Sequence, residues 1–386
     1  MDIINAKIMT MEEVDYENGY VTVQDGMIAA AGDMSAYTPS GGEVVDAAGA
    51  LLLPGFIDAH SHLGMWEDSL GFEGDDGNED TEPVTPQLRA IDAVNPMDKC
   101  FREAAAAGVT TVLTGPGSAN PIAGSWCAVK TCGRRVDDMI LDPAVGMKFA
   151  LGENPKSVYH GKNQTPVTRM ATAALIREQL TKAQRYLNDK RLAEQNSEDY
   201  DEPEFDMKCE ALIPVLNHEM KAIFHAHRAD DIFTALRITK EFNLDTVLIH
   251  CTEGYQIADL LKEGGAKVVT GPFLCDRSKP ELSGLDPKNP ALLWEAGVEN
   301  AICTDHPVTP IQYLPLCAAV AAAEGLPYRN ALAAITSIPA KLFGLEDRVG
   351  SIKAGKQADL ALYRSDPLGV CARPAMVWVN GKKVVG

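Results

Sequence analysis

Six of the eight histidines in this 386-residue chain stand at or just after the ends of short apolar runs. In a strand, side chains two positions apart point to the same side, so a His-x-His pair directs both rings at one cation. Imidazole nitrogens and carboxylates are the ligands that zinc-type ions prefer. The pattern therefore predicts a metal site. Its candidate residues are His60, His62, His225, His227, His250, His306 and the neighbouring Asp305.

These side chains must be brought together by the elements that carry them. Apolar runs alternate with helical patterns, which predicts a parallel sheet with crossover helices. In a parallel barrel the carboxyl ends of the strands meet at one mouth, where chemistry collects. Histidines scattered through a core would not share this strand-end position. The expected fold is α/β, a TIM-like (β/α)8 barrel with strands at 51–59, 109–115, 126–131, 144–152, 221–227, 246–251, 266–271 and 300–304.

A second module is expected because the chain exceeds the roughly 250 residues of a plain barrel. Short alternating segments broken by turns occupy residues 1–50 and return at 359–385, where Asn380-Gly381 has hairpin-turn composition. We expect residues 1–53 plus 349–386 to form one composite β-sandwich, and 54–348 to form the barrel with a long loop at 64–95. The alternative is that the two ends are unrelated edge strands.

Helices are expected at 97–107, 168–195 and 257–263, with glycine just past the first and third. The acidic stretch 198–204 is typical of an exposed loop. A hydrophobic content of 46% can fill a large core, and no apolar run approaches the roughly 18 residues of a membrane span.

Composition also limits the partners and the compartment. The net charge of −19 argues against nucleic acid, which needs a basic surface. The nine cysteines are odd in number and include no Cys-x-x-Cys pair, and the N-terminus lacks signal-peptide character. We expect a cytoplasmic protein that acts on a small molecule, without a nucleic-acid or membrane partner. A homo-oligomer is left open.

Three motifs together resemble the metal-dependent amidohydrolase superfamily, most closely its imidazolonepropionase-like and prolidase-like branch. They are LPGFIDAHSH at 53–62, GSIKAGKQADL at 350–360, and Asp305 after a late strand. The resemblance spans nearly the whole chain. It implies a TIM-like barrel flanked by a β-sandwich from both termini. It also implies metal-dependent hydrolysis of a C–N bond in a small amide, a cyclic amide or a dipeptide-like substrate.

The resemblance also assigns roles. It makes His60 and His62 ligands of the more buried ion, and gives His225 and His250 to a second ion or to a polarising role. One or two divalent ions, with zinc preferred, would lower the pKa of bound water to roughly 7. Asp305 would accept a proton from that water and return it to the departing amine. The alternative for Asp305 is a helix N-cap before Pro307.

Two choices stay open. The bridging group between two ions is either Lys148, as a carbamate, or Glu153, because relatives use one or the other. Five positions separate them, so in an unbroken strand they face opposite sides and only one should bind metal. His225 and His227 share a strand face. The resemblance favours His225 as the ligand and leaves His227 to polarise the substrate carbonyl, with a hydrogen-bonded barrel residue as the alternative.

Specificity is expected from loops. The 64–95 loop, with Trp66 and an acidic run at 73–80, is either a lid that offers carboxylates to a cationic substrate or a solvated excursion. Candidate anchors for a substrate carboxylate are Arg169, Arg228 and Arg277. A deaminase, lactonase or phosphoester hydrolase uses the same activated water, so fold resemblance does not choose among them. A catalytically silent scaffold would show gaps in the ligand set, and this chain shows none.

Overall fold

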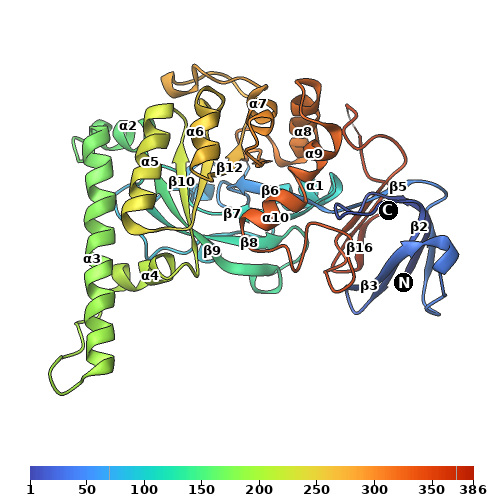
Figure 1. Cartoon of the computed structure of the whole chain (residues 1–386), viewed down its shortest axis with the longest axis horizontal. Coiled ribbons are helices and arrows are strands. Elements are labelled where there is room, and N and C mark those ends of the chain that lie inside the picture. The colour runs from blue at the N-terminus through green and yellow to red at the C-terminus, as the bar shows by residue number, and fades with distance from the viewer. Residues whose placement is uncertain (69, 371) are drawn as a thin grey trace.

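The computed structural model describes residues 1–68, 70–370 and 372–386. Two eight-stranded sheets organise the chain. The barrel sheet lies at the centre of Figure 1, and the sheet built from both chain ends lies at its right, where the N- and C-termini are marked. All eight cysteines among the described residues are free thiols. Among the same residues, no helix has both the length and the apolar content needed to cross a membrane.

The barrel sheet confirms the predicted fold class, with strands in the spatial order in which they occur along the chain. They are β6 (Phe56–Ser61), β7 (Val109–Thr114), β8 (Ile122–Lys130), β9 (Ile140–Ala150), β10 (Lys221–Ala226), β11 (Thr246–His250), β12 (Lys267–Thr270) and β13 (Asn300–Ile302). Backbone hydrogen bonds from the segment after β13 close the ring onto β6: Asp305 N donates to His60 O (3.0 Å) and His62 N donates to His306 O (2.9 Å).

The expectation of a wholly parallel sheet is wrong at one strand. β8 pairs antiparallel with both β7 and β9. The connections at 115–121 and 131–139 hold no α-helix, and they are shorter than the dozen or more residues that a parallel crossover requires. β8 therefore runs opposite to its neighbours, while the other adjacent pairs in this sheet remain parallel.

The run 51–59 also differs from its prediction as one barrel strand. It divides into β5 (Leu51–Pro54), which belongs to the terminal sheet, and β6, which belongs to the barrel. Gly55 marks the change of sheet. A Cβ at this position would lie 2.1 Å from Oγ1 of Thr110, so only glycine allows the close approach.

The terminal sheet joins the two chain ends, as predicted. β14 pairs with β5 on one side and with β15 on the other, so both ends share one hydrogen-bond network. The unrelated-edge alternative is therefore wrong. The division into 1–53 plus 349–386 and 54–348 stays a prediction. The strands are β1 (Asp2–Ile8), β2 (Tyr16–Gln24), β3 (Met27–Asp33), β4 (Val44–Asp46), β5, β14 (Leu360–Tyr363), β15 (Met376–Val379) and β16 (Lys382–Val385).

Ten α-helices occur among the described residues, and α5 to α8 lie along one side of the barrel sheet (Figure 1). The three predicted helices are present as α1, α3 and α6, and the acidic stretch 198–204 forms neither helix nor strand. The bounds are α1 (Lys99–Ala106), α2 (Glu153–Gly161), α3 (Arg169–Gln195), α4 (Met207–Leu216), α5 (Ala229–Phe242), α6 (Ala258–Glu263), α7 (Asn289–Glu295), α8 (Leu314–Ala323), α9 (Tyr328–Ala333) and α10 (Ser337–Leu342).

A buried ion pair connects the two sheets. Lys130, at the end of β8, pairs with Asp359, just before β14, and both side chains are almost fully buried. Asp359 also accepts a hydrogen bond from the backbone N–H of Asn380 (2.8 Å). Removing one partner would leave the other charge buried without compensation.

We expect Lys130→Ala to lower the free energy of unfolding by about 3–5 kcal/mol, because Asp359 would lose its counter-charge in the interior. Urea unfolding measures this change. Lys341→Ala is the matched control, since it breaks the exposed pair with Glu299 and should cost less than about 1 kcal/mol. Equal losses in the two variants would contradict the argument.

Candidate metal centre

The first cluster of ligand-type side chains joins β6 to the segment after β13. Nε2 of His60 and Nε2 of His62 each lie 3.2 Å from Oδ1 of Asp305. Nδ1 of His62 lies 2.7 Å from the carbonyl oxygen of Gly115, which makes Nδ1 the protonated nitrogen and leaves Nε2 free. Both histidines are buried and Asp305 is nearly so. No helix begins at Asp305, so the N-cap alternative is wrong.

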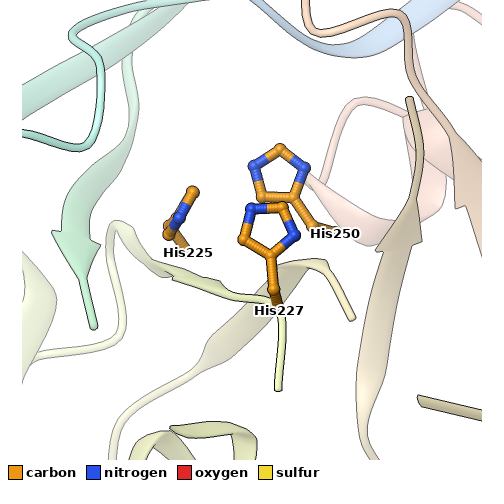
Figure 2. Close-up of side chains that lie close together, drawn as sticks. All are labelled: His225, His227 and His250. Atoms are coloured by element: carbon orange, nitrogen blue, oxygen red, sulfur yellow. The ribbon is translucent and has the colours of Figure 1, made fainter. Parts of the chain in front are cut away.

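The second cluster consists of His225, His227 and His250, shown side by side in Figure 2. The rings of His227 and His250 are stacked, 4.4 Å apart and 9° from parallel. His225 stands nearly perpendicular to both, with interplanar angles of 82° and 80°. A ring nitrogen's lone pair lies in the ring plane, so stacked rings aim in parallel and do not converge on one ion. His225 is therefore oriented to share an ion with one of the other two.

The surroundings distinguish His250 from His227. His250 lies beside the first cluster, with its ring 5.1 Å from that of His60. Its Nδ1 is 2.7 Å from the carbonyl oxygen of Gly271, which leaves Nε2 free. His227 lies 2.7 Å, through Nδ1, from Oγ1 of Thr252, and its Nε2 faces Glu281 at 3.7 Å. His250 thus faces the first cluster, and His227 faces away from it.

Several buried nitrogen atoms at this site have no hydrogen-bond partner among the described residues. They include both ring nitrogens of His60, Nδ1 of His225 and Nζ of Lys148. Leaving a buried polar atom unpaired costs about 1–3 kcal/mol. The presence of several such atoms at one place fits a site that binds divalent cations. Imidazoles and a carboxylate are also the ligands that such cations prefer.

Electrostatics at the site agree with that fit. Burial lowers the pKa of His250 to about 4, and it holds the pKa values of His60 and His225 well below their ordinary range. These imidazoles are neutral at physiological pH, as metal ligands must be. Burial alone would raise the pKa of Asp305, but the closeness of the His60 and His62 rings, each 3.2 Å from its carboxylate, outweighs burial and holds that pKa well below its usual value.

Lys148 lies within β9 and is fully buried. Its Nζ lies 5.0 Å from the centre of the Trp126 ring, and that ring stacks on His60 at 4.3 Å. Burial lowers the pKa of Lys148 from 10.5 to about 7, so its amine is partly neutral near physiological pH. The amine of Lys148 and the ring of His60 thus both pack against Trp126.

Glu153 has a different location. β9 ends at Ala150, and Glu153 is the first residue of α2 rather than the end of a strand. Its Oε2 accepts a hydrogen bond from the backbone N–H of Glu281 (3.1 Å). It lines a neighbouring cavity, not the one that holds the histidines. The chain bends at Gly152, which caps α2, so Glu153 does not continue the strand that carries Lys148.

Strained backbone accompanies the site. His250 has φ 73° and Asp305 has φ 53°, values in the left-handed region that non-glycine residues rarely adopt. Such conformations cost on the order of 1–3 kcal/mol each and persist where the surrounding structure imposes them. Here they turn two strand-end side chains into the mouth of the barrel.

A cavity of about 530 Å³ opens over the clusters, within the size range of small-molecule sites. From the 64–95 loop, Trp66 and Asn78 line it. The acidic run contributes Asp75, Asp76, Glu79 and Asp80 to a separate cavity. The loop therefore offers the metal cavity an aromatic ring and an amide, and not the carboxylates of the lid alternative.

The three arginines considered as anchors do not line the metal cavity. Arg169 pairs with Asp231 (2.9 Å) and Arg228 with Asp230 (2.9 Å), while a guanidinium nitrogen of Arg277 donates to the carbonyl oxygen of Leu285 (2.6 Å). These contacts are structural ones.

Two charged side chains close to the histidines escape sequence reasoning. Buried Glu281 and half-buried Lys279 form an ion pair of 2.8 Å in the loop after β12. Lys279 lines the metal cavity and donates to Oδ1 of Asn154 (2.7 Å). The loop shows no periodicity or metal-type spacing. Its only signal is its place after a barrel strand.

Comparisons with known proteins agree with this site. The model of the Amidohydrolase family matches residues 51–384. An amidohydrolase of Hapsidospora irregularis is 32% identical over 96% of this chain, and the chain spans 39% of that protein. The imidazolonepropionase of Acidiphilium cryptum is 26% identical over 94% of this chain and 90% of its own length.

A solved structure gives the same result. The crystal structure of an amidohydrolase from Thermotoga maritima is 40% identical to this chain. It superposes with a TM-score of 0.95 and covers 99% of both chains. The match extends over both sheets, because it covers nearly all residues. The chain belongs to the amidohydrolase family, as its strand-end histidines and glycine-rich closing motif predict.

Proposed function

We propose that this protein is a metal-dependent hydrolase that cleaves a C–N bond in a small amide, a cyclic amide or a dipeptide-like substrate. One observation carries the proposal: His62, His225, His250 and Asp305 line a ligand-sized cavity, and buried nitrogens of His60, His225 and Lys148 have no hydrogen-bond partner among the described residues. Membership of the amidohydrolase family agrees with this chemistry.

Two divalent ions, zinc by the chemistry of the donors, would be held as follows. His60, His62 and Asp305 hold the first. His225 and His250 hold the second, because their rings are nearly perpendicular and both lie near the first cluster. Lys148, as a carbamate, is the bridging group in preference to Glu153. This choice of Lys148 is supported by its amine, which has no hydrogen-bond partner among the described residues, and by its burial beside Trp126.

Bound ions of this kind supply activated water and polarise a carbonyl. The chain's own residues do the rest. Asp305 is ionised and partly open to the cavity, so its carboxylate accepts the proton of the attacking water and returns it to the departing nitrogen. His250, with its Nε2 free, would be a ligand of the second ion. The walls of the cavity exclude bulk water and orient the substrate.

His227, the remaining histidine of the second cluster, would contact the substrate instead of an ion. Its ring is stacked on His250 and so is badly directed for the same ion. Thr252 and Glu281 flank its two nitrogens, and the side chain lines the cavity. From there an N–H of His227 can donate to a carbonyl oxygen as negative charge develops on it.

The overall test is a substrate screen. The metal-loaded protein is assayed against N-acyl amino acids, dipeptides, lactams, lactones, aminopurines and phosphoesters. Hydrolysis of an amide or lactam with the highest kcat/KM is the expected outcome. A preference for esters, for aminopurines or for phosphoesters would count against the C–N hydrolase assignment.

His60→Ala should lower the bound divalent metal by at least one ion per chain and abolish hydrolysis, because His60 is one of the three ligand-type side chains of the first cluster. Elemental analysis of purified protein measures the metal content. His160→Ala is the control, since that exposed histidine lies on α2 outside both clusters. Full metal content in His60→Ala would remove the first site.

Lys148 and Glu153 can be separated by their pH behaviour. Because burial lowers the pKa of Lys148 to about 7, its neutral amine predominates above that pH and reacts with carbon dioxide. Metal uptake in bicarbonate should therefore rise as the pH increases from about 6 to about 8. His250, with a pKa of about 4, is neutral throughout this window.

Lys148→Met should lose this pH-dependent uptake and regain part of it with added acetate or propionate, which can take the place of the carbamate. Glu153→Gln should bind metal as the wild type does. The reverse result, with metal lost in Glu153→Gln and retained in Lys148→Met, would make Glu153 the bridging residue.

His227→Asn should keep both ions and lower kcat by about 10²–10³, the usual cost of removing one donor to a developing oxyanion. His225→Asn should lose an ion. Elemental analysis and steady-state kinetics on the two variants test the assignment together. If His227→Asn loses metal while His225→Asn keeps it, the two roles are exchanged.

A further inference from the structure

Trp66 is the only Phe, Tyr or Trp side chain among the described residues that line the metal cavity. It lies just after β6, and its ring packs edge-to-face against His62, 4.4 Å between centres and at 77°. Its Nε1 donates a hydrogen bond to Asp75. The indole thus packs directly against a candidate metal ligand, and part of the indole faces the cavity.

Two glycines hold this ring in place. A Cβ at Gly77 would lie 2.3 Å from Cε2 and from Cζ2 of Trp66, and a Cβ at Gly117 would lie 2.9 Å from its Cη2. These separations are far below van der Waals contact. Gly117 N also donates to Gly77 O (2.7 Å), which ties together the two segments that carry the glycines. The ring therefore occupies a slot beside Gly77 and Gly117, where a larger residue at either position would collide with it.

Aliphatic side chains such as Val158, Leu282 and Val308 also line the cavity, and several of its polar side chains are already paired. Polar groups of Ser118, Asn154 and Lys279 form a connected series, with Asn154 donating to Ser118 Oγ (2.7 Å) and accepting from Lys279 (2.7 Å). These groups already hydrogen-bond one another, whereas the indole offers a rigid apolar surface beside the first cluster. Aromatic side chains contribute most to binding when they supply such a preorganised surface.

We propose that Trp66 forms an apolar subsite beside the metal centre, which takes an aromatic or branched aliphatic group carried next to the scissile carbonyl. The inference rests on the proposed function, because the subsite is defined relative to the metal centre. It deepens that function by naming the substrate class: amides with an apolar substituent near the bond that is cleaved, rather than small polar amides.

Hydroxamates test the subsite without knowledge of the substrate, because their head group chelates divalent ions. Acetohydroxamate and benzohydroxamate differ only in the group next to the carbonyl. The ratio of their Kd values is measured by calorimetry on the zinc-loaded protein. We expect benzohydroxamate to bind roughly tenfold more tightly in the wild type, the scale of one aromatic contact with its buried area.

Trp66→Ala should bring that ratio close to one with little change in the Kd of acetohydroxamate, and Trp66→Phe should keep most of the preference. Gly117→Ala offers a second variant that leaves the ring in the chain. Its added methyl group would lie 2.6 Å from Oδ1 of Asn78 and 2.9 Å from Cη2 of Trp66, so it would displace the indole together with Asn78 and should also lower the ratio. Gly161→Ala is the matched control, because a Cβ there would meet no atom within 4 Å.

The outcomes separate the subsite from the proposed function. If Trp66→Ala and Gly117→Ala keep the wild-type ratio while binding acetohydroxamate normally, the subsite is wrong and the metal centre stands. Equal binding of both hydroxamates by the wild type also overturns the subsite. If wild-type protein supplied with zinc binds neither compound, the proposed metal centre is wrong, and the subsite is wrong with it. Metal content, measured on each variant, identifies which case applies.

Discussion

The desolvation of polar groups at the barrel mouth is the constraint on which the rest of this structure depends. The imidazoles of the two clusters, a carboxylate and a lysine amine are removed from water, and several of their nitrogens have no hydrogen-bond partner among the described residues. A stable fold can carry such groups only if they are kept neutral, paired with each other or satisfied by bound cations. Burial lowers the pKa values of His60, His225 and His250 and keeps these rings neutral, and the ionised Asp305 lies between His60 and His62.

The scaffold meets this constraint with backbone carbonyls. The carbonyl oxygen of Gly115 accepts from His62, and that of Gly271 accepts from His250, so each ring is held in one tautomer with Nε2 free. Such contacts orient metal ligands and raise their basicity. Beneath the rings, Trp126 stacks on His60 and covers Lys148. The antiparallel β8 supplies this tryptophan, so the exception to the parallel sheet serves the site directly.

The second sheet stabilises the arrangement from outside the barrel. β5 and β6 follow each other through Gly55, so the strand that carries His60 is continuous with a strand paired to the C-terminal segment. The ion pair between Lys130 and Asp359 joins the same two bodies through buried charge. Movement of one sheet relative to the other would therefore strain the first cluster. The position of the first cluster therefore depends on the sheet that both chain ends build.

Local patterns in the sequence were enough to predict much of this protein. Period-two spacing placed His60 with His62, strand-end position grouped them with His225, His250 and Asp305, and turn chemistry at Asn380-Gly381 located the final hairpin. These features depend on neighbouring residues and on rules that hold along one strand or turn. The same reasoning predicted α3, α1 and α6, whose apolar spacing and caps are local as well.

Tertiary structure alone decided the remainder. The direction of β8 follows from pairing between segments. The different locations of Lys148 and Glu153 follow from the end of β9 and the bend at Gly152, and the different orientations of His225 and His227 follow from ring planes that spacing cannot specify. Glu281 and the slot around Trp66 arise where loops meet. Strand spacing sets which face a side chain shares. Only the packing of distant segments sets its angle, its partners and its exposure to solvent.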